Sequence, residues 1–73
     1  MSHGRIEINP EIMRGKPVIK GTRITVESVL RKLGAGMSAK EIMADHPHLT
    51  EDGIRAAQAF AADHIADEEI VFG

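Results

Sequence analysis

The sequence contains no cysteine, tryptophan or tyrosine, and its only phenylalanines are Phe60 and Phe72. Without cysteine the chain has no disulfide, no thiolate nucleophile and no cysteine-based zinc or iron–sulfur site. A core with so few aromatic rings must be built from aliphatic side chains, which suits closely packed helices. No run approaches the ~20 apolar residues that a membrane-spanning helix needs, and the polar start lacks the apolar segment of a signal peptide. We therefore predict a cytoplasmic protein without membrane contact.

The chain is 73 residues long, which allows one domain with a thin core. A domain of this size buries only about 60% of the surface that its unfolded chain exposes, so association often stabilises such domains. We therefore expect a homodimer or a complex with a partner protein.

Charge is distributed unevenly along the chain, although the net charge is only −2. Residues 1–40 carry eight basic and three acidic side chains, whereas residues 41–73 carry one basic and eight acidic side chains. Such asymmetry is typical of a protein whose two surfaces meet different partners. Two solvated faces, or two halves that pair across a dimer, would give the same pattern.

The first part of the chain has the signals of two short strands joined by turns. Residues 6–8 alternate apolar and polar side chains, residues 9–10 (Asn-Pro) are a turn signal, and residues 17–19 are a second β-prone stretch. Residues 12–15 are too few for a stable helix and predict one helical turn closed by Gly15. The simplest assembly is a two-stranded hairpin.

Two helices are predicted in the middle of the chain. The first starts with Thr25 as N-cap, and its apolar residues recur at the spacing i, i+3, i+4 and i+7. The second starts at Ser38, which forms a capping box with Glu41, and it stops before Pro47 because the residue before a proline disfavours helical torsions. The apolar residues of the first helix are Val26, Val29, Leu30 and Leu33.

A third helix is predicted to start after Thr50 as N-cap and to end near residue 66. Together with the hairpin, the helices predict a mainly α domain over residues 1–66, followed by a tail at residues 67–73. The apolar stripe of the third helix consists of Ile54, Ala57, Phe60, Ala61 and Ile65.

The order of the helices is that of a helix-turn-helix unit, in which a short helix, a turn and a longer helix follow another helix. Packing of three helices without any nucleic-acid role gives the same pattern. In a DNA reader the helix after the turn presents Arg, Lys, Asn or Gln to the base edges. Here its first turn carries Glu51 and Asp52, which phosphates would repel, so we expect DNA contacts elsewhere.

Basic side chains are concentrated before and within the first helix. For a chain that binds double-stranded DNA they are the expected phosphate contacts, and no aromatic side chain is interleaved with them for base stacking. A solvated basic face is the alternative for each of them. The candidates are Arg14, Lys16, Lys20, Arg23, Arg31 and Lys32.

No catalytic or cofactor signature accompanies these cations. Gly15-Lys16 is followed by a proline where a phosphate-binding loop has serine or threonine. His46 and His48 form a His-x-His pair, but histidines in a proline-containing turn are more often ordinary polar residues of the turn than metal ligands. The sequence therefore predicts neither an enzyme nor a bound metal or cofactor.

The tail combines charge with apolar side chains that no helix stripe requires. A frayed terminus is the common fate of such residues. The alternative is a segment that orders on a partner protein, with its apolar side chains in a groove and its carboxylates facing cations. The candidate partner-binding residues are Glu68, Glu69, Ile70, Val71 and Phe72.

Three motifs recur in a family of known proteins: residues 15–24 (Gly-Lys-Pro-Val-Ile-Lys-Gly-Thr-Arg-Ile), 36–38 (Gly-Met-Ser) and 47–50 (Pro-His-Leu-Thr). In this order they resemble the small prokaryotic family named domain of unknown function four hundred and thirty-three, over about residues 6–62. The resemblance implies a homeodomain-like or winged three-helix fold with an N-terminal hairpin. It also implies an antitoxin encoded beside a PIN-like ribonuclease toxin, which as a dimer binds its own operator.

We therefore expect an antitoxin of a type II toxin–antitoxin pair that binds double-stranded DNA and a cognate toxin protein. A protein-interaction module without nucleic-acid binding is the second hypothesis, and the acidic start of the third helix favours it.

Overall fold

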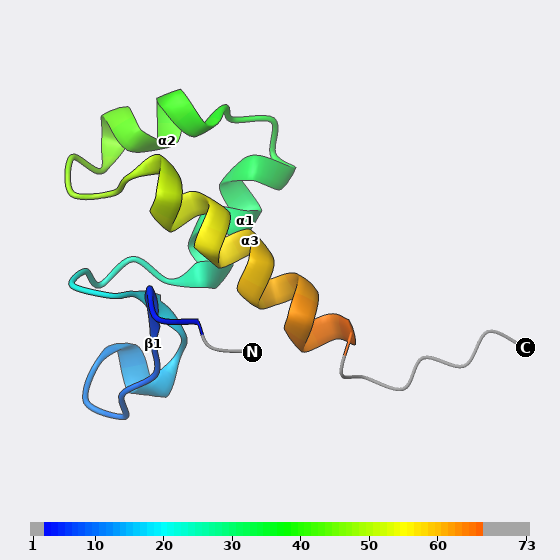
Figure 1. Cartoon of the computed structure of the whole chain (residues 1–73). Coiled ribbons are helices and arrows are strands. Elements are labelled where there is room, and N and C mark those ends of the chain that lie inside the picture. Colours follow the sequence, from blue (N-terminus) through cyan, green and yellow to red (C-terminus); the bar gives the residue numbers. More distant parts are fainter. Residues whose placement is uncertain (1–2, 67–73) are drawn as a thin grey trace, which may run out of the picture.

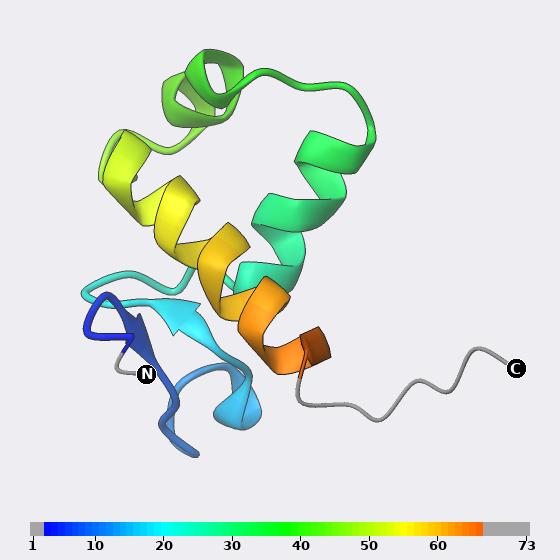
Figure 2. The ribbon, with the colours of Figure 1, turned by 45° about the vertical axis from the view of Figure 1, so that its right-hand side comes forward.

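The computed structural model describes residues 3–66, which form a two-stranded hairpin followed by three helices. This arrangement confirms the predicted mainly α architecture. In chain order the elements are β1 (Ile6–Glu7), the 3₁₀ turn η1 (Met13–Gly15), β2 (Val18–Ile19), α1 (Val26–Gly34), α2 (Ala39–Asp45) and α3 (Glu51–Ala66). Figures 1 and 2 show α3 crossing the middle of the molecule, with α2 above it and the hairpin below.

The hairpin is antiparallel and pairs Ile6 with Ile19 and Glu7 with Val18. After β2 the chain folds back on itself, because the Ile19 N–H donates to the Ile24 carbonyl at 2.9 Å. Val18 and Ile19 are both buried, so β2 forms one wall of the core. The hairpin thereby ties the N-terminal part of the chain to the helices.

The predicted single turn is present at η1, but it is left-handed. Met13, Arg14 and Gly15 have φ angles of +48°, +58° and +81°. Side chains other than glycine adopt this conformation at a cost, because Cβ crowds the following carbonyl oxygen. Two non-glycine residues therefore hold a backbone shape that the sequence pattern assigns only to Gly15.

Side-chain caps fix the start of each helix, as the sequence predicts. Thr25 Oγ1 accepts a hydrogen bond from the backbone N–H three residues later at 3.0 Å. Ser38 Oγ accepts from the Glu41 N–H at 3.1 Å, and the Glu41 carboxylate accepts from the Ser38 N–H at 3.0 Å, which completes the capping box. At α3, Thr50 Oγ1 accepts from the Gly53 N–H at 3.0 Å.

The core lies where α3 meets the rest of the fold. α3 contacts α1, α2 and both strands, and buried side chains from these elements and from the turn before α3 form one cluster. Among residues 3–66 no helix combines the length and apolar character that crossing a membrane requires. The buried members of the cluster are Ile19, Val26, Val29, Ile42, Leu49, Ile54 and Ala57.

The apolar stripe of α3 is buried only in its first half. Ile54 and Ala57 are 2% and 0% exposed, whereas Ile65 is 55% exposed. Figure 2 shows the last turn of α3 at the end of the helix farthest from α2. Periodicity marks which face of a helix is apolar, but it does not tell how far the neighbouring elements extend along that face.

Candidate nucleic-acid interface

Three of the six predicted cations line one shallow hollow beside α1. Lys16 comes from the segment before β2, and Arg31 and Lys32 come from the last turns of α1. The hollow has a volume of about 360 Å³, and Met13 from the left-handed turn also lines it. The fold thus brings together cations that lie fifteen residues apart in the sequence.

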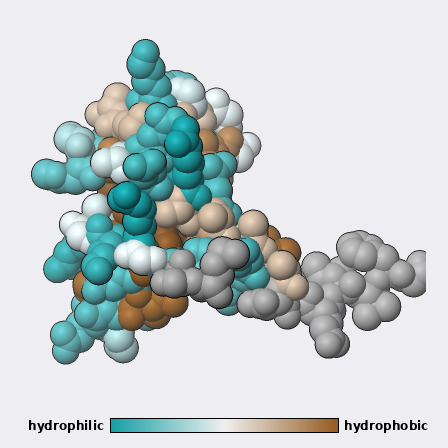
Figure 3. All heavy atoms as spheres, in the orientation of Figure 1, coloured by the Kyte–Doolittle hydropathy of each residue, from teal (hydrophilic) through white to brown (hydrophobic). Residues whose placement is uncertain are grey.

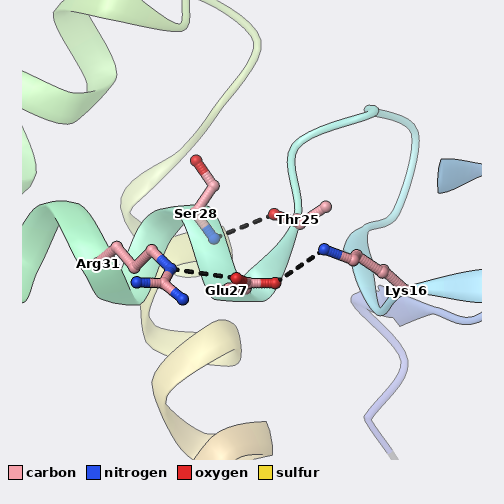
Figure 4. A network of polar contacts seen from close by, with 5 residues as sticks. All are labelled: Lys16, Thr25, Glu27, Ser28 and Arg31. Carbon is pink, nitrogen blue, oxygen red and sulfur yellow. Dashed lines mark hydrogen bonds and ion pairs between the residues drawn. The ribbon is translucent and has the colours of Figure 1, made fainter.

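Glu27 joins two of these cations and is the part of the hollow that sequence reasoning missed. Its carboxylate accepts a hydrogen bond from Lys16 Nζ at 3.0 Å through one oxygen and from Arg31 Nε at 3.1 Å through the other (Figure 4). The hydrogen bond from Lys16, together with that from Arg31, holds the pKa of Glu27 below its ordinary value. The i,i+4 spacing of Glu27 and Arg31 was the available signal.

Lys32 has a second structural role. Its Nζ lies 2.6 Å from Nε2 of His46, the residue that caps the end of α2. An ammonium group donates this hydrogen bond to a neutral imidazole, in which Nε2 is the acceptor. Lys32 therefore links α1 to the turn between α2 and α3, and keeps two further N–H groups for another acceptor.

Lys20 and Arg23 lie on the loop between β2 and α1, which one hydroxyl group holds closed. Thr22 Oγ1 donates to the Ile19 carbonyl at 2.7 Å and accepts from the Ile24 N–H at 3.0 Å. Lys20 and Arg23 are exposed, and within residues 3–66 no ion pair engages either of them. The loop presents both cations in a fixed backbone frame.

Lys20 also lines a second hollow, of about 320 Å³, at the start of α3. Arg5 from the hairpin and His48 from the turn before α3 share it. Sequence reasoning missed both residues, because they are separated from Lys20 by the length of a hairpin or of two helices. The carboxylate beside Arg5 is that of Asp52, whose Oδ2 lies 3.7 Å from Nη2 of Arg5.

The first turn of α3 carries its own neutralising network. Arg55 lies 2.7 Å from Glu51 and 3.8 Å from Asp52, so its guanidinium is engaged by two carboxylates of the same helix. The expectation that the helix after the turn is a poor reader of DNA bases stays a prediction.

Arg14, the sixth predicted cation, is exposed and sits at the left-handed position of η1. We predict that Arg14→Gly raises the free energy of unfolding by about 0.5–1 kcal/mol, because glycine adopts this φ without a Cβ penalty. Urea unfolding followed by circular dichroism measures the change. Arg14→Ala is the matched control, since it removes the same charge but keeps the penalty. A glycine variant less stable than the alanine variant would contradict the prediction.

An apolar groove of about 380 Å³ lies on the other side of Glu27 and Arg31. The first half of α1 and the second half of α3 form it, with Leu30, Phe60 and Ile65 among its lining residues. Figure 3 shows hydrophobic surface around the hairpin and along the C-terminal half of α3. Sequence reasoning assigned these side chains to a helix stripe and did not predict a groove.

Two further predictions concern the partner-binding segment and a metal site. The candidate partner-binding residues 68–72 lie outside the described residues. Within residues 3–66 no group of three or more histidine or carboxylate side chains is placed to hold a metal ion.

Comparison with known proteins identifies the family of the chain. The family model described as "Protein of unknown function (DUF433)" matches residues 6–61. The uncharacterized protein y4eO of Sinorhizobium fredii is 35% identical over 66 residues, which are 89% of this chain and 30% of that protein. A crystal structure of a DUF433 member protein from Anabaena variabilis has a TM-score of 0.79 and 29% identity, over 85% of this chain and 61% of that chain.

The chain thus spans about 30% of the length of y4eO and about 61% of the crystallised protein. The family match nevertheless runs from β1 into the second half of α3 and includes the hollow beside α1, most of the second hollow and most of the groove. The resemblance predicted from the residue 15–24 motif is confirmed: the chain belongs to the DUF433 family of proteins of unknown function.

Proposed function

We propose that the chain is an antitoxin-type DNA-binding protein that contacts the phosphates of duplex DNA with the β2–α1 loop and the basic side chains of α1. The observation that carries the proposal is the hollow beside α1, which Lys16, Arg31 and Lys32 line together with a single carboxylate, that of Glu27. This excess of cations over acids suits a backbone phosphate. Lys20 and Arg23 extend the cationic surface onto a closed loop.

The proposal assigns DNA contact to this surface and not to α3. Arg55 is already engaged by Glu51 and Asp52, so this basic side chain at the exposed start of α3 is less available to a phosphate. Phosphate contacts position a protein on the duplex without reading sequence. In this proposal the chain binds duplex DNA mainly through charge, so the affinity depends strongly on the salt concentration.

The proposal includes a homodimer as the DNA-binding form and a PIN-like nuclease as the cognate toxin. Both come from the resemblance to antitoxins of this kind. The apolar groove between α1 and α3 supports a protein partner, because exposed concave apolar surface marks interaction sites.

The test is the salt dependence of binding to a duplex from upstream of the gene, measured by gel shift. For Lys20→Gln with Arg23→Gln we expect the slope of log K against log salt to fall by about 1.8, the value for two lost phosphate contacts. The matched control is Lys40→Gln with Arg55→Gln, which makes the same change in net charge elsewhere. Equal effects of the two double variants would exclude the loop as the DNA surface.

Removal of the acid in the hollow has the opposite expected effect. Glu27→Gln releases Lys16 and Arg31 from their carboxylate, so we predict about five- to tenfold tighter DNA binding near 0.1 M salt, equivalent to one added phosphate contact. Glu41→Gln, on the exposed face of α2, is the control for an equal charge change. Unchanged affinity in the Glu27 variant would place the hollow outside the interface.

The same substitution has a pH signature in stability. Because the folded pKa of Glu27 is lowered, its ion pairs stabilise the fold above its ordinary pKa of 4.5, and this contribution is lost as the pH falls through the lowered value. Wild type should therefore be more stable than Glu27→Gln at pH 7, with the difference vanishing well below pH 4.5. A difference that persists in acid would point to packing rather than charge.

A protein-interaction module without DNA binding is the second candidate function, and the apolar groove is the observation that favours it. Absence of binding to any duplex at low salt, together with a stable complex with the neighbour-encoded protein, would select it over the first.

A further inference from the structure

The groove between α1 and α3 has an apolar floor, and the polar side chains that line it are Glu27, Arg31 and His64. Leu30 and Ala61 lie on facing helices, and the Phe60 ring stacks on the His64 ring at 5.9 Å with an interplanar angle of 16°. On the rim, Arg31 gives its Nε–H to Glu27. A guanidinium keeps four further N–H donors after one such bond. An occupant that suits this groove carries apolar side chains beside carboxylates.

Residues 67–73 of the chain have this chemistry. They read Asp-Glu-Glu-Ile-Val-Phe-Gly, with three carboxylates followed by three apolar side chains. They also start at the groove, because α3 ends at Ala66, one residue after the groove-lining Ile65. Apolar side chains from this segment would cover Ile65, which is 55% exposed in the described fold.

The connecting distance permits the segment to fold back on its own chain. Residues 67–69 span up to about 10 Å when extended, whereas Ala61 lies only about 7 Å before Ala66 along the helix axis. A reversal in these three residues therefore brings Ile70, Val71 and Phe72 alongside the second half of α3. So short a tether gives an effective concentration in the millimolar range, which a second copy at micromolar concentration does not match.

We propose that residues 70–72 dock in the α1–α3 groove of their own chain, with the carboxylates of residues 67–69 facing Arg31 and His64. The groove and the segment then form one intramolecular contact beside the second half of α3. This proposal is independent of whether the chain binds DNA, and it implies that a protein partner at the same groove must displace residues 70–72.

The absence of cysteine permits a direct test by disulfide trapping in the full chain. Ala61→Cys lies in the groove, and Val71→Cys lies in the centre of the docking segment. We expect this pair to form an intrachain disulfide roughly tenfold faster than a control pair, Ala59→Cys with Val71→Cys. Ala59 is exposed two residues earlier, on the opposite side of α3 according to helical geometry.

A second comparison separates docking from mere proximity. Adding Ile70→Ser and Phe72→Ser to the Ala61–Val71 pair removes the apolar contacts but keeps the tether, so trapping should slow about fivefold if burial drives docking. Equal rates for the groove pair and the control pair, or no effect of the serines, would overturn the proposal. Disulfide-linked dimers from the groove pair alone would instead assign the groove to a second copy of the chain.

Discussion

Ile42→Ala is expected to lower the free energy of unfolding by about 3–4 kcal/mol, within the range for truncating a buried isoleucine. Ile42 is fully buried and is the main anchor of the short helix α2 in the core. A chain of this size has a total stability of roughly 4–11 kcal/mol. The single truncation thus removes a large part of what holds the fold together.

The measurement is urea unfolding followed by circular dichroism at a helical wavelength, since the chain has no tryptophan or tyrosine for fluorescence. Ile8→Ala is the matched control, because Ile8 is 60% exposed and its truncation should change stability by at most about 0.5 kcal/mol. A loss below about 1 kcal/mol for Ile42→Ala would show that the site collapses around the smaller side chain.

Gly53→Leu is expected to destabilise the protein by about 2–3 kcal/mol, as overpacking of a close contact does. A Cβ at Gly53 would lie 3.2 Å from a methyl group of Ile19 and 3.3 Å from one of Leu49, so even the first added atom is tight. A leucine there must push β2 away from α3. Thermal unfolding of the variant measures the loss.

Gly34→Leu is the control for Gly53→Leu, because a Cβ at Gly34 meets nothing within 4 Å. It should be neutral or slightly stabilising, since leucine has the higher helix propensity. Equal destabilisation of the two variants would contradict the proposed close approach of α3 to the hairpin. Gly53→Ala should fall between them, because its tight contact opposes its gain in propensity.

Features that depend on neighbours in the sequence could be predicted from the sequence. Thr25, Ser38 and Thr50 were identified as caps, and the structure confirms each one by its hydrogen bond. The same holds for the pairing of the two strands, whose apolar residues and turn signals lie close together. Such features are local, because a capping side chain makes its hydrogen bond with a backbone N–H group only a few residues away.

Features that depend on distant segments could not be predicted. Arg14 adopts a left-handed conformation that only the surrounding fold imposes. Lys20 and His48 line one hollow because the hairpin packs against the start of α3. Ile65 has the periodicity of a core residue, but it is 55% exposed beside the open groove between α1 and α3. In the candidate interface, composition identified the cations, whereas their grouping around Glu27 required the tertiary structure.

The central position of α3 has a consequence for synthesis on the ribosome. Since α1, α2 and both strands all pack on α3, the segments made first cannot complete the core until residues 51–66 emerge. The hairpin alone is too small to be stable in water. We therefore expect this domain to reach its full fold only after α3 has left the ribosome.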